Sequence, residues 1–278
     1  MNVRSDGTYI DATLGAGGHA AEILKVVREG KGRLLGIDRD PAAVEWARAR
    51  LSGNEEKLIV QVGNFRDIDA IHAARGLPPA DGILADLGLS SMQLQDAARG
   101  FSFAALGPLD MRMDAETGTT AEEIVNRTGG RELADLIFKL GEERHSRRIA
   151  RAIVEARPIR TTTELAQVVT RAIPSRAGLH QIHPATRTFM ALRLAVNREL
   201  ENLEAFLSKA LEVMASGGRL VVLSYHSLED RIVKRAFVGA KQAGRVRILT
   251  KHVVCPSEAE IRRNPRSRSA KLRCAEKV

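Results

Sequence analysis

A glycine-rich turn between two apolar segments is the feature that most limits what this chain can fold into. The segment Tyr9-Ile10-Asp11-Ala12 predicts a short buried strand, which runs into Gly15-Ala16-Gly17-Gly18-His19 and then into a helix over 20–28. A second apolar segment, 34–37, ends on Asp38. Glycines let the backbone turn sharply and approach a ligand, and a carboxylate at the next strand end can bind a ribose diol. The pattern predicts a β-α-β unit with a nucleotide site.

The alternation of strands and helices continues to Asp86. A helix is expected over 42–51, a third strand over 58–62 that stops at Gly63-Asn64-Phe65, and a fourth over 83–85 that stops at Asp86. Strands that alternate with helical segments form parallel sheets with crossover helices. The fold class is therefore α/β.

The alternation breaks between 96 and 197, where only helical patterns occur. Capping signals at Thr120–Glu123 and Thr161–Glu164 each precede an amphipathic segment. Afterwards one helical pattern runs from Phe189 to Met214, with Gly217-Gly218 as its end, and strands are expected over 220–223, 246–249 and 270–274, the last two as an antiparallel edge. We therefore expect a discontinuous catalytic domain, 1–95 with 198–278, interrupted by a helical insertion over 96–197.

Composition limits the class of protein. No apolar run approaches the roughly 20 residues that span a bilayer, and the start of the chain has no apolar signal region, so a cytoplasmic protein without a membrane partner is expected. Cys255 and Cys274 are too few for a disulfide framework or a zinc site, and no metal is expected. Of the net charge of +9, a net +8 lies from Gly239 onward, with eleven Lys or Arg and three Glu. This basic tail favours a polyanionic partner, nucleic acid ahead of membrane.

The identity of the cofactor depends on residues beyond the turn. Gly15-x-Gly17-x-x-Ala20 satisfies a loose dinucleotide pattern and alone is a weak signal. Asp11 is placed to hold the amino group of a methionine moiety, and Asn64-Phe65 to flank an adenine ring. The helical insertion occupies the place where a nicotinamide enzyme needs its second nucleotide half. These features favour S-adenosylmethionine over a nicotinamide cofactor.

Eight segments spread over the chain carry a family resemblance. They are Tyr9–His19 (YIDATLGAGGH), Gly82–Ser91 (GILADLGLSS), Arg99–Phe103 (RGFSF), Gly107–Asp114 (GPLDMRMD), His183–Phe189 (HPATRTF), Gly217–Arg219 (GGR), Ser224–Arg235 (SYHSLEDRIVKR) and Asn264–Ser269 (NPRSRS). Together they resemble the bacterial 16S ribosomal RNA cytosine-N4 methyltransferase family, RsmH or MraW. The resemblance implies a Rossmann-like class I S-adenosylmethionine-dependent methyltransferase sheet, in which the helical insertion recognises the RNA. It also implies that the cofactor is held by seven residues: Gly17, Gly18, His19, Asp38, Phe65, Asp86 and Gln93.

The family's substrate is a cytidine in the decoding region of small-subunit ribosomal RNA, so 16S RNA or the small subunit is the expected partner. The exocyclic amine of cytosine is a poor nucleophile and needs a hydrogen-bond acceptor and alignment with the methyl group. We expect Asp86 or its carbonyl to serve the amine, with Ser90 and Ser91 nearby as helix caps or catalysts. His226 is the candidate that holds the base or relays the proton, since histidine is the residue type suited to proton transfer near neutral pH, although a structural hydrogen bond is the alternative.

Arginines in three places are expected to contact RNA phosphates, which position RNA without reading its sequence. They are Arg144, Arg148 and Arg151 on a basic helix, Arg187 and Arg193 further on, and Arg266 and Arg268 in the tail. Arg187 and Arg193 are six residues apart and cannot share a helix face, so one of them is expected to be structural. Asp110, Arg112 and Asp114 are expected to form a local ion network.

Two other functions stay open at this stage. One is a nicotinamide oxidoreductase, and the other is a non-catalytic RNA-binding assembly factor with a vestigial cofactor fold. The sequence leaves the oligomeric state open between monomer and homodimer.

Overall fold

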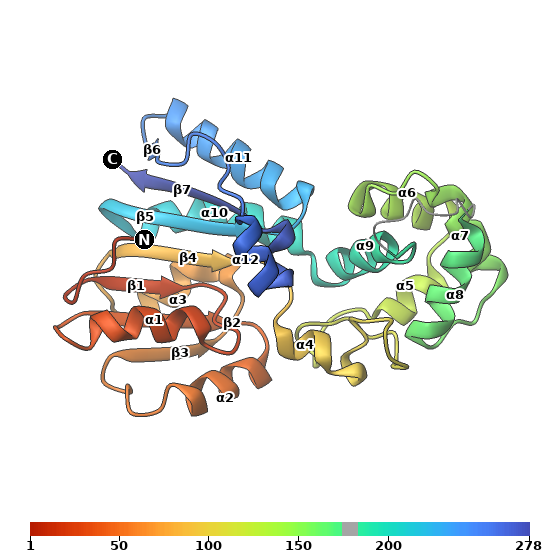
Figure 1. Ribbon diagram of the computed structural model, residues 1–278, viewed down its shortest axis with the longest axis horizontal. Helices are drawn as coiled ribbons and strands as arrows, with labels where there is room; N and C mark the ends of the chain where they lie inside the picture. The colour runs from red at the N-terminus through yellow and green to blue at the C-terminus, as the bar shows by residue number, and fades with distance from the viewer. Residues whose placement is uncertain (174–182) are drawn as a thin grey trace. The chain divides into compact units, whose positions relative to one another are not determined.

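The computed structural model describes residues 1–173 and 183–278. The chain divides into two compact units (Figure 1): unit 1 comprises Met1–Gly88 and Leu200–Val278, and unit 2 comprises Leu89–Glu199. The division lies at 88/89 and 199/200 rather than at the expected 95/96 and 197/198, because the segment 89–95 packs with the helices of unit 2 through Leu89. Each unit has its own hydrophobic core.

Unit 1 is an alternation of strands and helices. Its elements are β1 (Thr8–Asp11), α1 (Gly18–Val27), β2 (Arg33–Asp38), α2 (Pro41–Arg50), β3 (Leu58–Val62), η1 (Phe65–Asp67), α3 (Ile68–Ala74), β4 (Ala80–Asp86), α10 (Glu199–Val213), β5 (Met214–Ser224), α11 (Ser227–Gln242), β6 (Val246–Ile248), α12 (Glu258–Arg263), η3 (Pro265–Ser269) and β7 (Lys271–Lys277).

The seven strands form one sheet in the order β3-β2-β1-β4-β5-β7-β6. β1 to β5 are parallel, and β7 is antiparallel to both of its neighbours. The order reverses direction at β1 and β4, the topological switch point where open α/β sheets bind ligands beyond the carboxyl ends of the strands. The expected α/β sheet with an antiparallel edge is confirmed, and β7 is inserted between β5 and β6.

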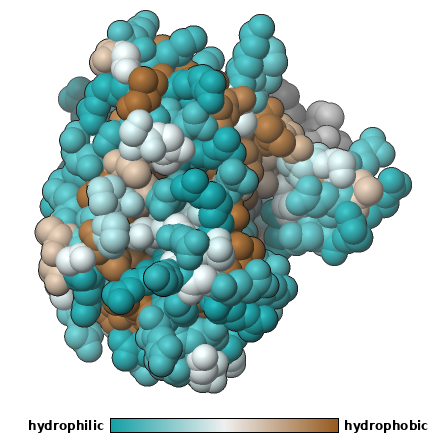
Figure 2. Space-filling view, turned by 90° about the vertical axis from the view of Figure 1, so that its left-hand side faces the viewer, coloured by the Kyte–Doolittle hydropathy of each residue, from teal (hydrophilic) through white to brown (hydrophobic). Residues whose placement is uncertain are grey.

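Successive residues of the strands face opposite layers, as the twofold period of a strand requires. Tyr9 and Leu34 pack with α1 and α2 on one face, whereas Ile10 and Leu35 pack with α3, α10 and α11 on the other. All four side chains are fully buried. Helices on both faces explain why the strands read as continuous apolar runs. Figure 2 views unit 1 from the amino ends of the parallel strands, a face where mostly hydrophilic residues surround scattered apolar ones.

Unit 2 is helical in its described residues, which contain no β-strand apart from an isolated bridge between Pro108 and Thr161. Its elements are α4 (Ser91–Gln95), η2 (Ala97–Arg99), α5 (Ala121–Arg127), α6 (Gly130–Gly141), α7 (Ser146–Glu155), α8 (Thr162–Ala172) and α9 (Thr186–Asn197). The capping boxes expected at Thr120 and Thr161 are confirmed, because each hydroxyl accepts the N3 amide while the N3 glutamate accepts the cap amide.

The single helix expected from Phe189 to Met214 is wrong. Arg198, in a left-handed conformation with φ of 50°, separates α9 from α10. The break is held by Asn197, whose buried side chain binds the carbonyl of Met111 at 2.7 Å and the amide of Met113 at 2.8 Å. Gly217 and Gly218 lie within β5 rather than at a helix end. Hydrophobic periodicity continues across this break, so the pattern alone does not reveal it. Within 1–173 and 183–278, no helix is long and apolar enough to cross a membrane.

Candidate active site

The glycine turn and Asp38 are joined directly. The amide of Gly15 donates to Oδ2 of Asp38 at 2.8 Å, and the amide of Asp40 donates to Oδ1 at 2.9 Å. Burial raises the pKa of Asp38, and the two backbone amides oppose that rise. Each carboxylate oxygen accepts a single amide here and can accept a further donor. The end of β2 is therefore an acceptor site for hydroxyl groups.

The start of α1 is open for a ligand. Gly17 is the N-cap residue with φ of 76°, a conformation that glycine adopts without strain, and within the described part of the chain no side chain caps the helix. A Cβ atom on Gly17 would lie 2.9 Å from Leu51 Cδ1, whereas one on Gly18 would meet nothing within 4 Å. The first amides of a helix without a side-chain cap are available to a polar ligand.

Asp11, at the end of β1, is a fully buried carboxyl. Its Oδ1 accepts the amide of Thr13 at 3.3 Å, and its Oδ2 has no hydrogen-bond partner among the described residues. Burial raises its pKa to about 7, and the charge of His19 opposes that rise. A buried acceptor without a partner is costly unless a ligand supplies the donor. An ammonium group fits this oxygen both as donor and as charge partner.

Asp86, at the end of β4, is the centre of a hydrogen-bonded cluster. Tyr225 OH donates to its Oδ1 at 2.8 Å, His19 Nε2 lies 3.1 Å from its Oδ2, and its amide donates to Thr13 Oγ1 at 2.6 Å. The pKa of His19 is raised, mainly by the hydrogen bond to Asp86. Tyr225 was not among the residues predicted for the site. The signal that identifies it is its position directly after β5, the strand that neighbours β4.

His226 has a structural role that competes with the predicted catalytic one. It is the N-cap residue of α11, and its Nδ1 accepts the amide of Glu229 at 3.4 Å. Its Nε2 is buried and lies 3.1 Å from Glu229 Oε1 without forming a hydrogen bond. The ring is 12% exposed. The histidine that reaches Asp86 is therefore His19, and a proton-relay role for His226 stays a prediction without a contact that supports it.

Asn64 and Phe65 lie just after the end of β3, as expected. Asn64 caps η1 by accepting the amide of Arg66, and the half-buried Phe65 packs edge-on against Phe206 with ring centroids 5.1 Å apart. The Phe65 ring is thereby fixed beside the carboxyl end of β3, where a flat apolar ring of a ligand can pack against it.

Ser90, Ser91 and Gln93 belong to unit 2. Ser90 Oγ accepts the amide of Gln93 at 3.2 Å, while Gln93 Oε1 accepts the amide of Ser90 at 3.0 Å, a capping box at the start of α4. Ser90 thus has the capping role that was weighed against a catalytic one. Ser91 is the first residue of α4. The contribution of Gln93 to the cofactor site stays a prediction.

The residues of unit 1 fit the S-adenosylmethionine that the resemblance implies. Asp38 would accept the ribose hydroxyls, and Phe65 would flank the adenine. The unpaired Oδ2 of Asp11 would accept the methionine ammonium, and the uncapped amides of α1 would face the carboxylate end of the amino acid. The cofactor would supply an electrophilic methyl group attached to a sulfonium.

The buried carboxyl predicts a pH-dependent stability. For Asp11 the pKa is higher in the folded chain than in the unfolded one, so the folded state holds an extra proton between about pH 4 and pH 7. Stability is therefore lost as pH rises through that window, by at most about 4 kcal/mol. Asp11→Asn removes this loss. Without cofactor, the Tm of the variant relative to the parent chain should rise from pH 5 to pH 8.

Two measurements separate this effect from a general change in packing. S-adenosylmethionine should stabilise the parent chain at pH 8 far more than it stabilises the Asp11→Asn variant, because the variant has lost the negative charge that pairs with the ammonium. A Tm difference that is equal at both pH values would contradict the assignment.

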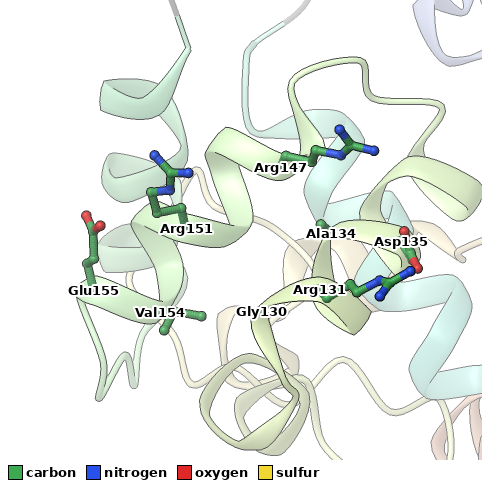
Figure 3. A pocket seen from close by; sticks show the side chains of 8 residues that line it. All are labelled: Gly130, Arg131, Ala134, Asp135, Arg147, Arg151, Val154 and Glu155. Carbon is green, nitrogen blue, oxygen red and sulfur yellow. The ribbon is translucent and has the colours of Figure 1, made fainter.

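Unit 2 contains a groove between α6 and α7 with a volume of about 600 Å³. Figure 3 shows Arg131 and Asp135 on α6 and Arg147, Arg151 and Glu155 on α7 around it. Among the residues that the structure describes, none of these three arginines has an ion pair or hydrogen bond. Arg144 and Arg148 are exposed near the start of α7. Arg131 was not among the predicted contacts, whereas Arg147 lies on the basic helix from which RNA contact was expected.

The arginines Arg187 and Arg193, which were also predicted to contact RNA, differ in their exposure and in their ion pairs. Arg193 forms a two-pronged ion pair with Glu199 at 2.8 and 3.1 Å, and its side chain is 16% exposed. Arg193 thus has the structural role that was expected of one member of its pair, and its contact with RNA stays a prediction. Arg187 is exposed and lies 3.8 Å from Glu143. Arg112 forms the expected ion pair with Asp110, at 2.8 Å.

Part of the C-terminal basic segment lies beside the carboxyl end of β5, at the edge of the sheet where the candidate site is. Lys271, the first residue of β7, is paired with Ser224, the last residue of β5. η3, which carries the exposed Arg266 and Arg268, directly precedes it. The tail therefore lies near the strand end that positions Tyr225. Arg273, within β7, forms an ion pair with Asp230 at 2.7 Å.

Comparisons with known proteins agree with this architecture. The family model described as "MraW methylase family" matches residues 1–278. The chain is 51% identical to ribosomal RNA small subunit methyltransferase H of Acidobacterium capsulatum, covering 100% of this chain and 94% of the relative. It is 52% identical to the protein of the same name from Koribacter versatilis, covering 99% and 89%.

Among solved structures, an rRNA methylase candidate from Clostridium thermocellum aligns with a TM-score of 0.50 at 14% identity, covering 99% of this chain and 91% of that one. This likeness shows the fold alone. The sequence matches do not favour a nicotinamide oxidoreductase or a non-catalytic assembly factor. The chain belongs to the MraW methylase family and is an S-adenosylmethionine-dependent methyltransferase.

Proposed function

We propose that this enzyme transfers the methyl group of S-adenosylmethionine to the exocyclic N4 amine of a cytidine in the decoding region of 16S ribosomal RNA. The observation that carries the proposal is the carboxylate of Asp86, which stands at the switch point of the sheet with each oxygen held by one side chain. The names of the relatives, ribosomal RNA small subunit methyltransferase H, support the choice of substrate.

The chemistry requires an acceptor for the amine. The lone pair of N4 is delocalised into the cytosine ring, and a hydrogen bond from the amine to Asp86 makes it more available. The nitrogen then forms a bond to the methyl carbon, the electrons of the carbon–sulfur bond return to sulfur, and the nitrogen releases one proton. Alignment of the two reacting groups contributes about 7–11 kcal/mol in favourable intramolecular cases.

Asp86 is the first acceptor for that proton in this proposal. His19 Nε2 lies 3.1 Å from Asp86 Oδ2, and its side chain is 49% exposed. This half-exposed ring connects the partly buried cluster around Asp86 with solvent. The contact favours His19 over His226 as the histidine nearest to the chemistry.

The decisive experiment is label transfer from S-adenosylmethionine to small ribosomal subunits and to naked 16S RNA, followed by identification of the methylated nucleoside. We expect N4-methylcytidine. Methyl on cytosine C5 or on a ribose oxygen would refute the amine chemistry. The comparison of subunits with naked RNA determines whether the partner is the assembled particle. The proposed substrate places the enzyme in the cytoplasm, and the oligomeric state stays open between monomer and homodimer.

The groove of unit 2 is proposed as a site for the RNA backbone. Its three arginines, which form no ion pair within 1–173 and 183–278, outnumber Asp135 and Glu155. Replacing Arg131, Arg147 and Arg151 by Gln should lower RNA affinity on the order of 10-fold or more at low salt. It should also reduce the slope of log Kd against log salt by about 2, since each phosphate contact in single-stranded RNA contributes about 0.7. RNA binding in a salt titration measures both.

A matched pair of single variants tests whether the position of the charge matters. Arg147→Gln removes an arginine of the groove, and Arg160→Gln removes an exposed arginine of unit 2 outside it. We expect the first to reduce the salt slope and the second to leave it unchanged. Equal effects would indicate that the charge of the whole unit attracts the RNA, and would contradict the proposal that the groove binds the RNA backbone.

A further inference from the structure

Tyr225 reaches Asp86 because two neighbouring strands end together. In the parallel pair β4–β5, Asp86 lies beside Leu223, and the amide of Leu87 donates to the carbonyl of Leu223 at 3.0 Å. Tyr225 follows two residues later, beyond the end of β5. The sheet register thus determines which side chain stands beside the carboxylate.

The loop that carries Tyr225 is anchored on both sides. The amide of Tyr225 donates to Glu229 Oε2 at 2.9 Å, and Glu229 is 2% exposed. Ser224 Oγ lies 3.4 Å from the carbonyl of Lys271, which it contacts across β5 and β7. A Cβ atom on Gly88 would lie 3.9 Å from Tyr225 Cδ2. Hydrogen bonds therefore fix the backbone that carries the ring, and the bond from the hydroxyl to Asp86 fixes the end of the ring.

Tyr225 and His19, the two side chains that contact the Asp86 carboxylate, differ in how their protonation depends on pH. Burial raises the pKa of Tyr225 above its ordinary value, and the charges of Asp86 and Glu229 raise it further, so the phenol stays protonated. A neutral phenol bonded to a carboxylate acts only as a donor. His19 gains and loses a proton nearer to neutral pH. Of the two, Tyr225 is the partner whose donation does not change with pH.

We propose that Tyr225 is the positioning residue of the methyl transfer: its hydroxyl fixes the Asp86 carboxylate so that the remaining acceptor positions face the amine. The inference rests on the proposed function, since it assigns a partner to the acceptor named there. A carboxylate free to rotate would offer the amine an acceptor in only part of its orientations. A hydrogen bond that prevents rotation raises the fraction of productive complexes without adding a contact to the substrate.

The test is a double-mutant cycle with a matched control. Tyr225→Phe should lower kcat by about 10- to 100-fold, the effect of one hydrogen bond to a charged group, with KM for S-adenosylmethionine changed less than about threefold. Because Tyr225 acts through Asp86, the same substitution made on an Asp86→Ala background, where the phenol has no carboxylate to hold, should cost little further activity. Tyr9→Phe is the control. Tyr9 is the chain's other tyrosine, and its hydroxyl accepts the amide of Arg4 at 2.7 Å.

Each outcome decides the proposal. A kcat for Tyr225→Phe within twofold of the parent chain would overturn it. An equal loss on both backgrounds would also overturn it, because Tyr225 would then act independently of Asp86. A loss shared by Tyr9→Phe would indicate a general effect of removing a buried hydroxyl, which circular dichroism and Tm would detect. Absence of methyl transfer in the parent chain would instead refute the proposed function, so the two failures are distinguishable.

Discussion

Replacement of Asp86 by Asn should reduce methyl transfer by about 100- to 1,000-fold while cofactor affinity changes by less than about tenfold. The amide preserves the shape of the side chain and still accepts a hydrogen bond from Tyr225, but it carries no charge and cannot accept the proton that leaves N4. Positioned acid–base groups contribute typically 10²–10⁴-fold. Initial rates with 16S RNA measure the first effect, and calorimetric titration with S-adenosylmethionine measures the second.

A carboxylate on the same strand provides the matched control. Asp81 lies in β4, five residues before Asp86, where it accepts the amide of Thr8 at 2.9 Å and pairs with Arg4. Asp81→Asn removes an equal charge at the opposite end of the strand, and we expect kcat to stay within twofold of the parent chain. If Asp86→Asn keeps more than a tenth of the parent activity, Asp86 is not the acceptor for the amine.

The second large effect concerns the stability of unit 2. Glu199→Ala should destabilise the unit by up to roughly 3 kcal/mol, because it leaves the largely buried guanidinium of Arg193 without its partner. The double replacement Arg193→Met with Glu199→Leu should recover most of that loss, since an apolar pair of similar size leaves no buried charge. The carbonyl of Arg193 also accepts Asn197 Nδ2 at 2.9 Å, so a disturbed ion pair should loosen the break between α9 and α10.

The readout must report on unit 2. Trp46, the single tryptophan, lies in α2 of unit 1, so its fluorescence is a poor probe here. Hydrogen exchange of peptides from α9 gives the local free energy of opening. Restored protection together with unchanged RNA affinity in the double variant would identify Arg193 as structural. Unchanged exchange in Glu199→Ala would refute the energetic role of the pair, and a loss of RNA affinity in the stable double variant would return Arg193 to the RNA contacts.

Much of the cofactor side of the site was predictable from the sequence. The strands before Asp11, Asp38 and Asp86 are short apolar runs bounded by turn residues, and in a parallel sheet their carboxyl ends meet at one edge. The capping boxes at Thr120 and Thr161 were predictable for the same reason: both partners of each hydrogen bond lie within four residues of sequence.

The acceptor side was less predictable. His226 and Arg193 carry functional groups suited to the roles expected of them. In the structure, however, His226 caps α11 and Arg193 forms an ion pair with Glu199. The left-handed residue Arg198 turns the chain between Arg193 and Glu199, and residue types alone do not specify that turn. In the sequence, an arginine that is paired across a helix break cannot be distinguished from an exposed arginine.

The order of elements, the glycine turn and the carboxylates that follow the strands are readable in the sequence, because they depend on local period, turn chemistry and chain direction. The hydrogen bonds between distant side chains, in contrast, depend on how the strands pair. Asp86 and Tyr225 are separated by 139 positions and meet because β4 and β5 pair in a specific register. A shift of that register by one residue would turn Tyr225 to the other face of the sheet. The partner of the proposed catalytic carboxylate is therefore a consequence of strand pairing, which no local pattern encodes.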